Sequence, residues 1–319
     1  MMKIVVLDGY TLNPGDLSWE RIKKLGDCTI YDRTAKHEVI ERMRDAEIVL
    51  TNKTVIDKEA IESCSNLKYI GVLATGYNVV DVKSAAEKAI VVTNVPAYST
   101  DSVSQLIFAH ILHICHHVSE HNQSVKRGDW SKSEDFCYWN YPLMELTDKT
   151  LGVIGLGAIG YKTAKIAESF GMKVLAYSRN PKKELETENL KYCELDDLYK
   201  NSDIISLNCS LSESTEKMIN KTSIAKMKDG VILINTSRGG LVNEKDLADA
   251  LNSKKISMAG IDVVSVEPIS ENNPLLQAEN CIITPHIAWA VFEARARLMS
   301  IASANIEAFL EAKSLNVIC

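Results

Sequence analysis

The apolar residues of this chain gather in short continuous runs, and amphipathic stretches separate one run from the next. The first run, KIVVL at residues 3–7, is typical of a parallel strand that is covered on both faces. Strands that alternate with short helices predict βαβ units and parallel sheets. Strands are expected at 3–7, 28–31, 48–51, 69–72, 90–92, 151–154, 174–177, 204–207, 231–234, 258–261 and 281–283, and helices at 17–25, 38–44, 58–63, 100–120, 158–170, 223–227, 244–251 and 292–309.

Composition and charge limit the number of domains and the kinds of partner that the protein can have. The 319 residues are 46% hydrophobic and 24% charged, which is enough for two α/β domains. A net charge of -6 without a long Lys/Arg run argues against nucleic acid or a membrane surface as a partner. The longest apolar stretch, 106–118, is too short to span a bilayer. Eight scattered cysteines without a Cys-x-x-Cys pair favour reduced thiols and a cytoplasmic location.

The most informative stretch is residues 149–181, KTLGVIGLGAIGYKTAKIAESFGMKVLAYSRNP. An apolar run leads into Gly155-x-Gly157-x-x-Gly160, followed by a helical pattern and a second apolar run. Strand, tight turn, helix and strand within about thirty residues are typical of a dinucleotide-binding βαβ unit. The alternative is an ordinary βαβ unit with a tight turn and no ligand.

Each glycine of this pattern has its own expected role. Gly155 permits the sharp turn, Gly157 lets the backbone approach a pyrophosphate, and Gly160 lets the helix pack closely on the strand. The N–H groups at the helix start, at Ala158 and Ile159, and the positive end of the helix dipole would then stabilise the phosphates. A glycine cap at residue 171 would close the helix.

The end of the second strand departs from the usual pattern. An acidic residue there normally binds the ribose hydroxyls of NAD, but this chain has Ser178 and Arg179. Without the carboxylate there is no repulsion of a 2′-phosphate, and the arginine could bind one. These residues favour NADP(H) as the cofactor. NAD(H) remains the alternative if Arg179 is only a solvated charge.

Reactive side chains follow three apolar strands in the same half of the chain. They are Arg238 in NTSRGG, Asp262 and Glu267 in GIDVVSVEP, and His286 in TPHIA. Each could be an ordinary loop or cap residue. Because the carboxyl ends of parallel strands share one edge of the sheet, we expect them to lie together beside the cofactor.

The chemistry of reducing a 2-oxo acid assigns roles to these residues. Hydride delivery to a carbonyl develops negative charge on its oxygen, which calls for a proton donor such as His286. Glu267 would orient that histidine through its other ring nitrogen. Arg238 could bind the substrate carboxylate with two hydrogen bonds and polarise the carbonyl.

Two further features leave alternatives open. A helical pattern runs from Thr100 to Glu120, and histidines one turn apart lie in it and just after it. These histidines suggest a metal-binding face. The apolar residues of the pattern favour the alternative, which is packing between domains or subunits. The histidines in question are His113, His117 and His121. The loop 73–78 is either a carboxylate-binding loop or an ordinary strand-to-helix turn.

The motifs LATGYNVVD, NVPAYSTDSVSQ, GVIGLGAIG, INTSRGGLVNE, GIDVVSVEP and TPHIAWA together resemble the D-isomer-specific 2-hydroxyacid dehydrogenase family. The resemblance covers essentially the whole chain and is closest to family members that act on glycerate and hydroxypyruvate. It implies a flavodoxin-like substrate domain (1–99 plus 290–319) and a Rossmann cofactor domain (100–289), with a cleft between them. It also implies a homodimer built around the cofactor domain.

The resemblance further implies which residues bind the ligands. The catalytic set would be Arg238, Glu267 and His286, and Asp262 would contact the nicotinamide carboxamide. The substrate carboxylate would be held by Ala74, Thr75 and Gly76, together with Arg238 and His286, and further cofactor contacts would come from Asn208, Cys209 and Thr236.

The chain departs from the family pattern in two places, at Ser178 and at Ser210, where the family commonly has a proline. Hydroxypyruvate, glyoxylate and larger 2-oxo acids all remain open as substrates. A dinucleotide-sensing binding protein of the corepressor type is the main alternative, although the chain lacks the interaction tail that such proteins carry. A metal-dependent hydrolase that uses the histidine-rich helix is a third interpretation.

Overall fold

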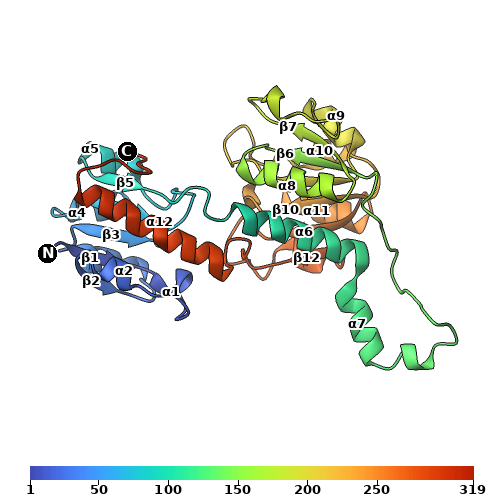
Figure 1. Ribbon diagram of the computed structural model, residues 1–319, viewed down its shortest axis with the longest axis horizontal. Helices are drawn as coiled ribbons and strands as arrows, with labels where there is room; N and C mark the ends of the chain where they lie inside the picture. Colours follow the sequence, from blue (N-terminus) through green and yellow to red (C-terminus); the bar gives the residue numbers. More distant parts are fainter. The chain divides into compact units, whose positions relative to one another are not determined.

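A computed structural model describes all 319 residues. The chain forms two compact units, one of residues Met1–Ser99 with Trp289–Cys319 and one of residues Thr100–Ala288 (Figure 1). No helix is both long enough and apolar enough to cross a membrane.

The unit that contains both termini is built on a five-stranded parallel sheet of order β2-β1-β3-β4-β5. This is the strand order of flavodoxin-like folds, so the predicted fold of this unit is confirmed. Its strands are β1 Lys3–Val6, β2 Asp27–Ile30, β3 Ile48–Thr51, β4 Tyr69–Val72 and β5 Val91–Thr93. Its helices are α1 Gly9–Leu12, α2 Glu20–Lys23, α3 Val39–Met43, α4 Lys58–Ser63, α5 Val82–Glu87 and α12 Phe292–Leu310.

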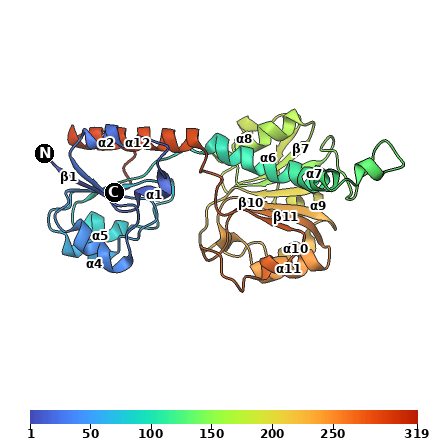
Figure 2. The same cartoon turned by 90° about the horizontal axis from the view of Figure 1, so that it is seen from below.

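Helices cover both faces of this sheet. Figure 2 shows α2 and α12 on one face and α4 and α5 on the other. The side chains of the strands alternate between two buried clusters, one beneath α3 to α5 and one beneath α2 and α12. Burial on both faces explains why these strands are continuous apolar runs in the sequence.

The second unit has a seven-stranded parallel sheet of order β12-β11-β10-β9-β6-β7-β8. From β8 to β11 this is the order of dinucleotide-binding domains, with β12 added beyond it. Its strands are β6 Thr150–Ile154, β7 Lys173–Tyr177, β8 Leu190–Tyr192, β9 Ile204–Leu207, β10 Val231–Asn235, β11 Ile256–Ile261 and β12 Cys281–Ile283. Its helices are α6 Thr100–His116, α7 Val118–Lys126, α8 Ala158–Ser169, α9 Leu195–Asn201, α10 Lys221–Lys226 and α11 Glu244–Asn252.

Two cores lie on opposite faces of this sheet. Figure 2 shows α6 and α8 on one face and α10 and α11 on the other. Val231 and Leu233 of β10 belong to the core beneath α9, α10 and α11. Ile232 and Ile234 belong to the core beneath α6 and α8. Successive strand residues point to opposite faces, so an unbroken apolar strand serves both cores at once.

The helix expected at 100–120 differs from the prediction. It ends at His116, and His117 has a left-handed backbone (φ 47) before α7 begins. The His117 ring stacks on Tyr141 of the following loop at 4.6 Å. The prediction of one continuous helix to Glu120 was therefore wrong, although the His117 N–H still donates to the His113 carbonyl and the His121 N–H to the His117 carbonyl, which keeps these histidines one turn apart. No group of three or more potential ligands that could hold a metal ion is present.

Candidate active site

The turn between β6 and α8 has the geometry that its glycines predict. Gly155 has a φ of +97, and a Cβ there would lie 2.7 Å from the Cys209 nitrogen. A Cβ on Gly160 would lie 2.0 Å from the Gly155 carbonyl oxygen. Both contacts are with backbone that cannot move aside, so only glycine allows the helix to start this close to the strand.

The start of α8 is open toward an anion. Gly157 is the N-cap residue and has no side chain to accept the first N–H groups, those of Ala158, Ile159 and Gly160. A Cβ on Gly157 would meet no atom within 4 Å. The far end of the helix is closed by Gly171 (φ +73), with hydrogen bonds from its N–H and that of the next residue back into the last turn. The helix thus presents free donors and its positive dipole end at one place.

Two buried polar atoms without partners lie at the same edge of the sheet as this turn. The Thr236 hydroxyl, just after β10, and the Asn208 side-chain oxygen, just after β9, have no hydrogen-bond partner. Buried polar groups are rarely left unpaired unless a ligand or water binds them. Together with the uncapped helix start, these atoms fit a dinucleotide.

The end of β7 carries the residues that bear on cofactor choice. Ser178 is half-buried and Arg179 is exposed. Burial raises the pKa of the Cys209 thiol, and the nearby Arg179 guanidinium partly opposes that shift. Arg179 follows β7, which pairs in parallel with β6, so it lies at the sheet edge where β6 leads into the glycine turn.

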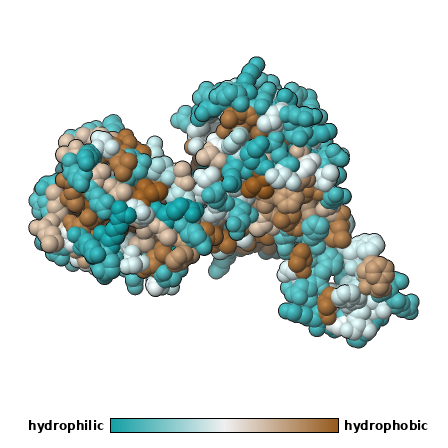
Figure 3. Space-filling view, viewed as in Figure 1, coloured by the Kyte–Doolittle hydropathy of each residue, from teal (hydrophilic) through white to brown (hydrophobic).

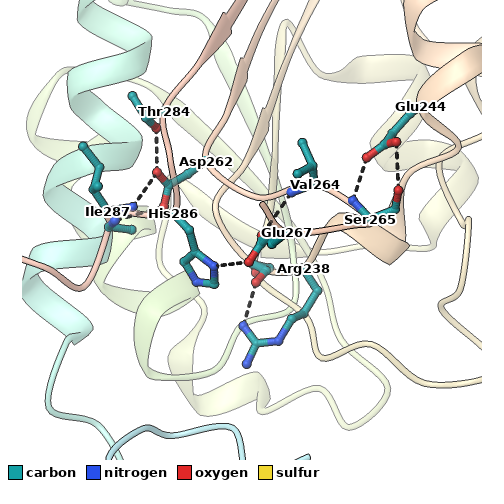
Figure 4. A network of polar contacts seen from close by, with 11 residues as sticks. Arg238, Glu244, Asp262, Val264, Ser265, Glu267, Thr284, His286 and Ile287 are labelled. Carbon is teal, nitrogen blue, oxygen red and sulfur yellow. Dashed lines mark hydrogen bonds and ion pairs between the residues drawn. The ribbon is translucent and has the colours of Figure 1, made fainter. Parts of the chain in front are cut away.

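A histidine and a carboxylate form a close pair at the same edge. His286 Nδ1 lies 2.7 Å from Glu267 Oε2. Glu267 Oε1 accepts a hydrogen bond from the Val264 N–H at 3.2 Å, which holds the carboxylate in place. The side chains of His286 and Glu267 are 25% and 38% exposed. Because Nδ1 donates to the carboxylate, Nε2 is the ring atom left to meet a substrate (Figure 4).

Arg238 lies next to this pair, as Figure 4 shows. Its backbone carbonyl accepts a hydrogen bond from Asn235 Nδ2 at 3.0 Å, and its guanidinium donates to the Ser237 carbonyl at 2.7 Å. A Cβ on Gly239 would lie 1.9 Å from the Val264 carbonyl carbon. This glycine therefore lets the loop that carries Arg238 touch the loop that leads to Glu267.

Asp262 is buried and bonded to the loop that carries His286. Its Oδ1 accepts from the Thr284 hydroxyl (2.6 Å) and the Ile287 N–H (2.9 Å), and its Oδ2 accepts from the Ala288 N–H (2.9 Å). Its carbonyl oxygen accepts from the His286 N–H at 2.9 Å. In this structure Asp262 shapes the histidine loop, and a contact to a nicotinamide carboxamide stays a prediction.

Sequence reasoning missed two anchors of the site. Glu244, the first residue of α11, accepts hydrogen bonds from the Ser265 N–H (2.6 Å) and hydroxyl (2.8 Å) and so fixes the loop before Glu267. Thr284 holds the buried carboxylate described above. An acid in the first turn of a helix and a threonine before a proline are both common, so neither gave a usable signal.

The predicted carboxylate loop belongs to the other unit and is described there alone. Ala74, Thr75 and Gly76 follow β4. The Thr75 hydroxyl donates to the Val95 carbonyl at 2.9 Å, and the Ala74 carbonyl accepts from the Val95 N–H at 3.0 Å. These bonds fix the loop without using the N–H groups of residues 74–76 as donors.

Comparison with known proteins identifies the family. Residues 108–288 match the model of the D-isomer specific 2-hydroxyacid dehydrogenase NAD-binding domain. A hydroxypyruvate reductase of Blautia hydrogenotrophica is 57% identical over 99% of both chains. The chain belongs to the D-isomer specific 2-hydroxyacid dehydrogenase family. A glycerate dehydrogenase of Methylorubrum extorquens is 40% identical over 99% of this chain and 98% of its own.

Solved structures agree with this membership. An acyclic imino acid reductase in complex with NADPH and D-Arg superposes with a TM-score of 0.87, at 32% identity over 100% of both chains. The family's dinucleotide-binding domain thus coincides with the unit in which the glycine turn, Arg238, Glu267 and His286 were found.

Two glycine substitutions test the dinucleotide turn. Gly157→Ala has room for its Cβ, so we expect unchanged thermal stability but a Kd for reduced dinucleotide raised about tenfold, a loss of about 1.4 kcal/mol. Gly160→Ala serves as the contrasting variant, because its overpacking should lower the free energy of unfolding by about 1–3 kcal/mol. Thermal unfolding and fluorescence titration measure both. Unaltered dinucleotide affinity in Gly157→Ala would show that no phosphate sits at this residue.

Proposed function

We propose that the protein reduces hydroxypyruvate, and glyoxylate as a smaller substrate, to the corresponding 2-hydroxy acid with a nicotinamide dinucleotide. The His286–Glu267 pair at 2.7 Å beside Arg238 is the observation that carries this proposal. Two relatives that span nearly the whole chain, a hydroxypyruvate reductase and a glycerate dehydrogenase, support the choice of substrate.

Each residue of the site has a separate proposed role in carbonyl reduction. A bound reduced dinucleotide would supply the hydride. Arg238, which lies beside this pair, would bind the substrate carboxylate and polarise the adjacent carbonyl. His286 supplies a proton to the carbonyl oxygen from Nε2, while Glu267 fixes the ring through Nδ1. The N–H groups of residues 74–76 are proposed to hold the substrate carboxylate as well.

Turnover of hydroxypyruvate in the wild type, followed by oxidation of the reduced cofactor, tests this function. His286→Ala should lower kcat by about 10²–10⁴-fold, because the proton donor is gone, while the Kd for dinucleotide stays within about twofold. Glu267→Gln should lower kcat less, since an amide can still accept a hydrogen bond from the ring. His116→Ala, an exposed histidine of the same unit, is the matched control.

The opposite pattern would remove the proposed role of His286. Preserved turnover in His286→Ala, or loss of dinucleotide binding as its main effect, would show that the histidine is not the proton donor. Dinucleotide binding by a wild-type protein that reduces no 2-oxo acid would favour the binding-protein alternative instead.

We propose NADP(H) as the preferred cofactor, with NAD(H) accepted less well. The exposed Arg179 at the end of β7 and the absence of an acidic residue at Ser178 support this choice. A charge-assisted pair between a guanidinium and a 2′-phosphate would account for the preference.

Arg179→Ala should raise the KM for NADPH about tenfold and leave the KM for NADH nearly unchanged. Ser178→Asp should reverse the preference, because a carboxylate repels a 2′-phosphate and binds ribose hydroxyls. Lys200→Ala, an exposed cation of α9, serves as the control. Steady-state assays with both cofactors at matched concentrations measure the ratios. Equal effects of Arg179→Ala on both cofactors would mean that the arginine does not contact the phosphate.

We propose that two copies of the chain associate through an arm formed by residues 118–145. The arm contains α7 and a long loop that extends away from the sheet of its unit (Figure 1). Figure 3 shows apolar, brown side chains on this arm. Its exposed large apolar and aromatic residues are Val118, Val125, Trp130, Phe136, Trp139, Tyr141 and Leu143. Clustered aromatic residues of this kind are typical of protein interfaces.

Sedimentation velocity of the wild type is expected to give the mass of a dimer. The double substitution Phe136→Ser and Trp139→Ser removes side chains that are 89% and 65% exposed, and should weaken association by about 10²-fold or more. Val55→Ser, which removes a 57% exposed apolar side chain of the other unit, should leave the mass unchanged. A monomeric wild type would refute the proposal.

A cytoplasmic location is also proposed. All eight cysteines are free thiols, which is the state expected in a reducing compartment.

A further inference from the structure

One helix holds both ends of the loop that carries His286. His110 Nε2 of α6 lies 3.2 Å from the Thr284 hydroxyl oxygen, at the start of the loop. The Ser102 hydroxyl, nearer the start of the same helix, donates to the carbonyl oxygen of Ala288, at the end of the loop. The side chain of His110 is buried, and the mechanism proposed above does not use it.

The directions of the hydrogen bonds follow from what each group can donate. Thr284 has a single hydroxyl proton, and it points to Asp262 Oδ1 at 2.6 Å. The Thr284 oxygen is therefore the acceptor toward His110, and His110 carries its proton on Nε2. Burial lowers the pKa of His110, so its ring is neutral at physiological pH and has one N–H to give. A chain of two hydrogen bonds thus runs from His110 to Asp262.

The sheet makes room for this imidazole. A Cβ on Gly260 of β11 would lie 2.8 Å from His110 Cβ, 2.9 Å from Cγ and 3.0 Å from Nδ1. The ring of His110 occupies the space where any other residue at 260 would place its side chain. Gly260 and Asp262 are two residues apart at the end of β11. His110 packs on Gly260 and is linked to Asp262 through the Thr284 hydroxyl.

We propose that His110 is a positioning residue for His286, acting through the Thr284 hydroxyl on the buried carboxylate of Asp262. The proposal rests on the function inferred above for His286. The hydroxyl of Thr284 could rotate freely about its C–O bond, but an N–H donor on one side of the oxygen directs its proton to the other side. The Thr284 hydroxyl then remains a hydrogen-bond donor to Asp262. This bond, together with those from the N–H groups of residues 286–288 to Asp262, fixes the backbone of the loop that carries His286.

A double-mutant cycle on kcat tests this proposal. Thr284→Val keeps the volume and loses the hydroxyl, and should lower kcat about 10–100-fold, as expected when a reacting group is misplaced. His110→Leu should lower kcat about 5–10-fold on the same grounds, with the KM for reduced dinucleotide within about twofold of wild type. His110→Gln and Thr284→Ser retain the hydrogen-bonding atoms and should recover kcat to within about threefold of wild type.

The combined variant separates positioning from packing. If His110 acts through Thr284, then His110→Leu with Thr284→Val should lower kcat no more than Thr284→Val alone, to within about twofold. Effects that multiply, or a His110→Leu variant with wild-type kcat, would overturn the proposal. Failure of His110→Gln to recover activity, in a variant that melts like wild type, would also overturn it.

A spectroscopic readout keeps the test independent of turnover. In protein labelled with ¹⁵N-histidine, the seven histidines can be assigned by single substitutions. The ring resonances of His286 should shift in His110→Leu and stay in place in His116→Ala. An unmoved His286 signal in His110→Leu would overturn the positioning role, even if no 2-oxo acid is a substrate. Absence of turnover in the wild type, with a shifted His286 signal, would instead count against the proposed function alone.

Discussion

The candidate site exists because all strands of the second sheet run in parallel. Their carboxyl ends share one edge, so residues that are far apart in sequence come together there. Asn208 follows β9, Arg238 lies just beyond β10, Asp262 follows β11, and His286 lies just beyond β12. Parallel pairing determines which edge these residues share, and the loops determine how closely they approach. At the tightest of these approaches, Gly239 against Val264, only a residue without a side chain would fit.

Hydrogen bonds to Asp262 fix the conformation of the loop that carries His286. A buried carboxylate is costly unless hydrogen bonds compensate for the lost water, and hydrogen bonds to a charged group are worth about 1.5–3 kcal/mol each. All three of its side-chain partners come from residues 284–288. His286 within that loop has a left-handed backbone (φ 54), a conformation that costs a non-glycine residue of order 1–3 kcal/mol. The same loop therefore carries a strained histidine and the hydrogen-bond donors that a buried acid requires, so these bonds offset part of the cost of the strained backbone.

The sequence predicted what depends on local pattern and missed what depends on contacts from elsewhere. Residues 48–51, 69–72 and 204–207 are strands as expected, because short apolar runs rich in β-branched residues favour strands over helices. The helix break at His117 coincides with a ring contact to Tyr141, twenty-four residues later, and no glycine or proline near His117 marks it in the sequence. His110 lies within a predicted helix, but its partner Thr284 is 174 residues away, so no local pattern indicates their hydrogen bond. The pairing of Glu267 with His286 could be anticipated from chemistry, although their roles and those of the cofactor residues remain predictions.

Helix α6 connects the two halves of the proposed chemistry. Near its start it meets α8, where the Ser104 hydroxyl oxygen lies 3.3 Å from the Ile159 carbonyl oxygen and accepts a hydrogen bond from Thr163 at 3.4 Å. About 9 Å further along, at 1.5 Å per residue, His110 meets the loop that carries His286. A rigid helix with contacts at both places fixes the distance between the start of α8 and His286 more firmly than two flexible loops could. The arm continues directly from the same helix at His117, so association of two copies would act on the one element that both the dinucleotide turn and the histidine loop contact.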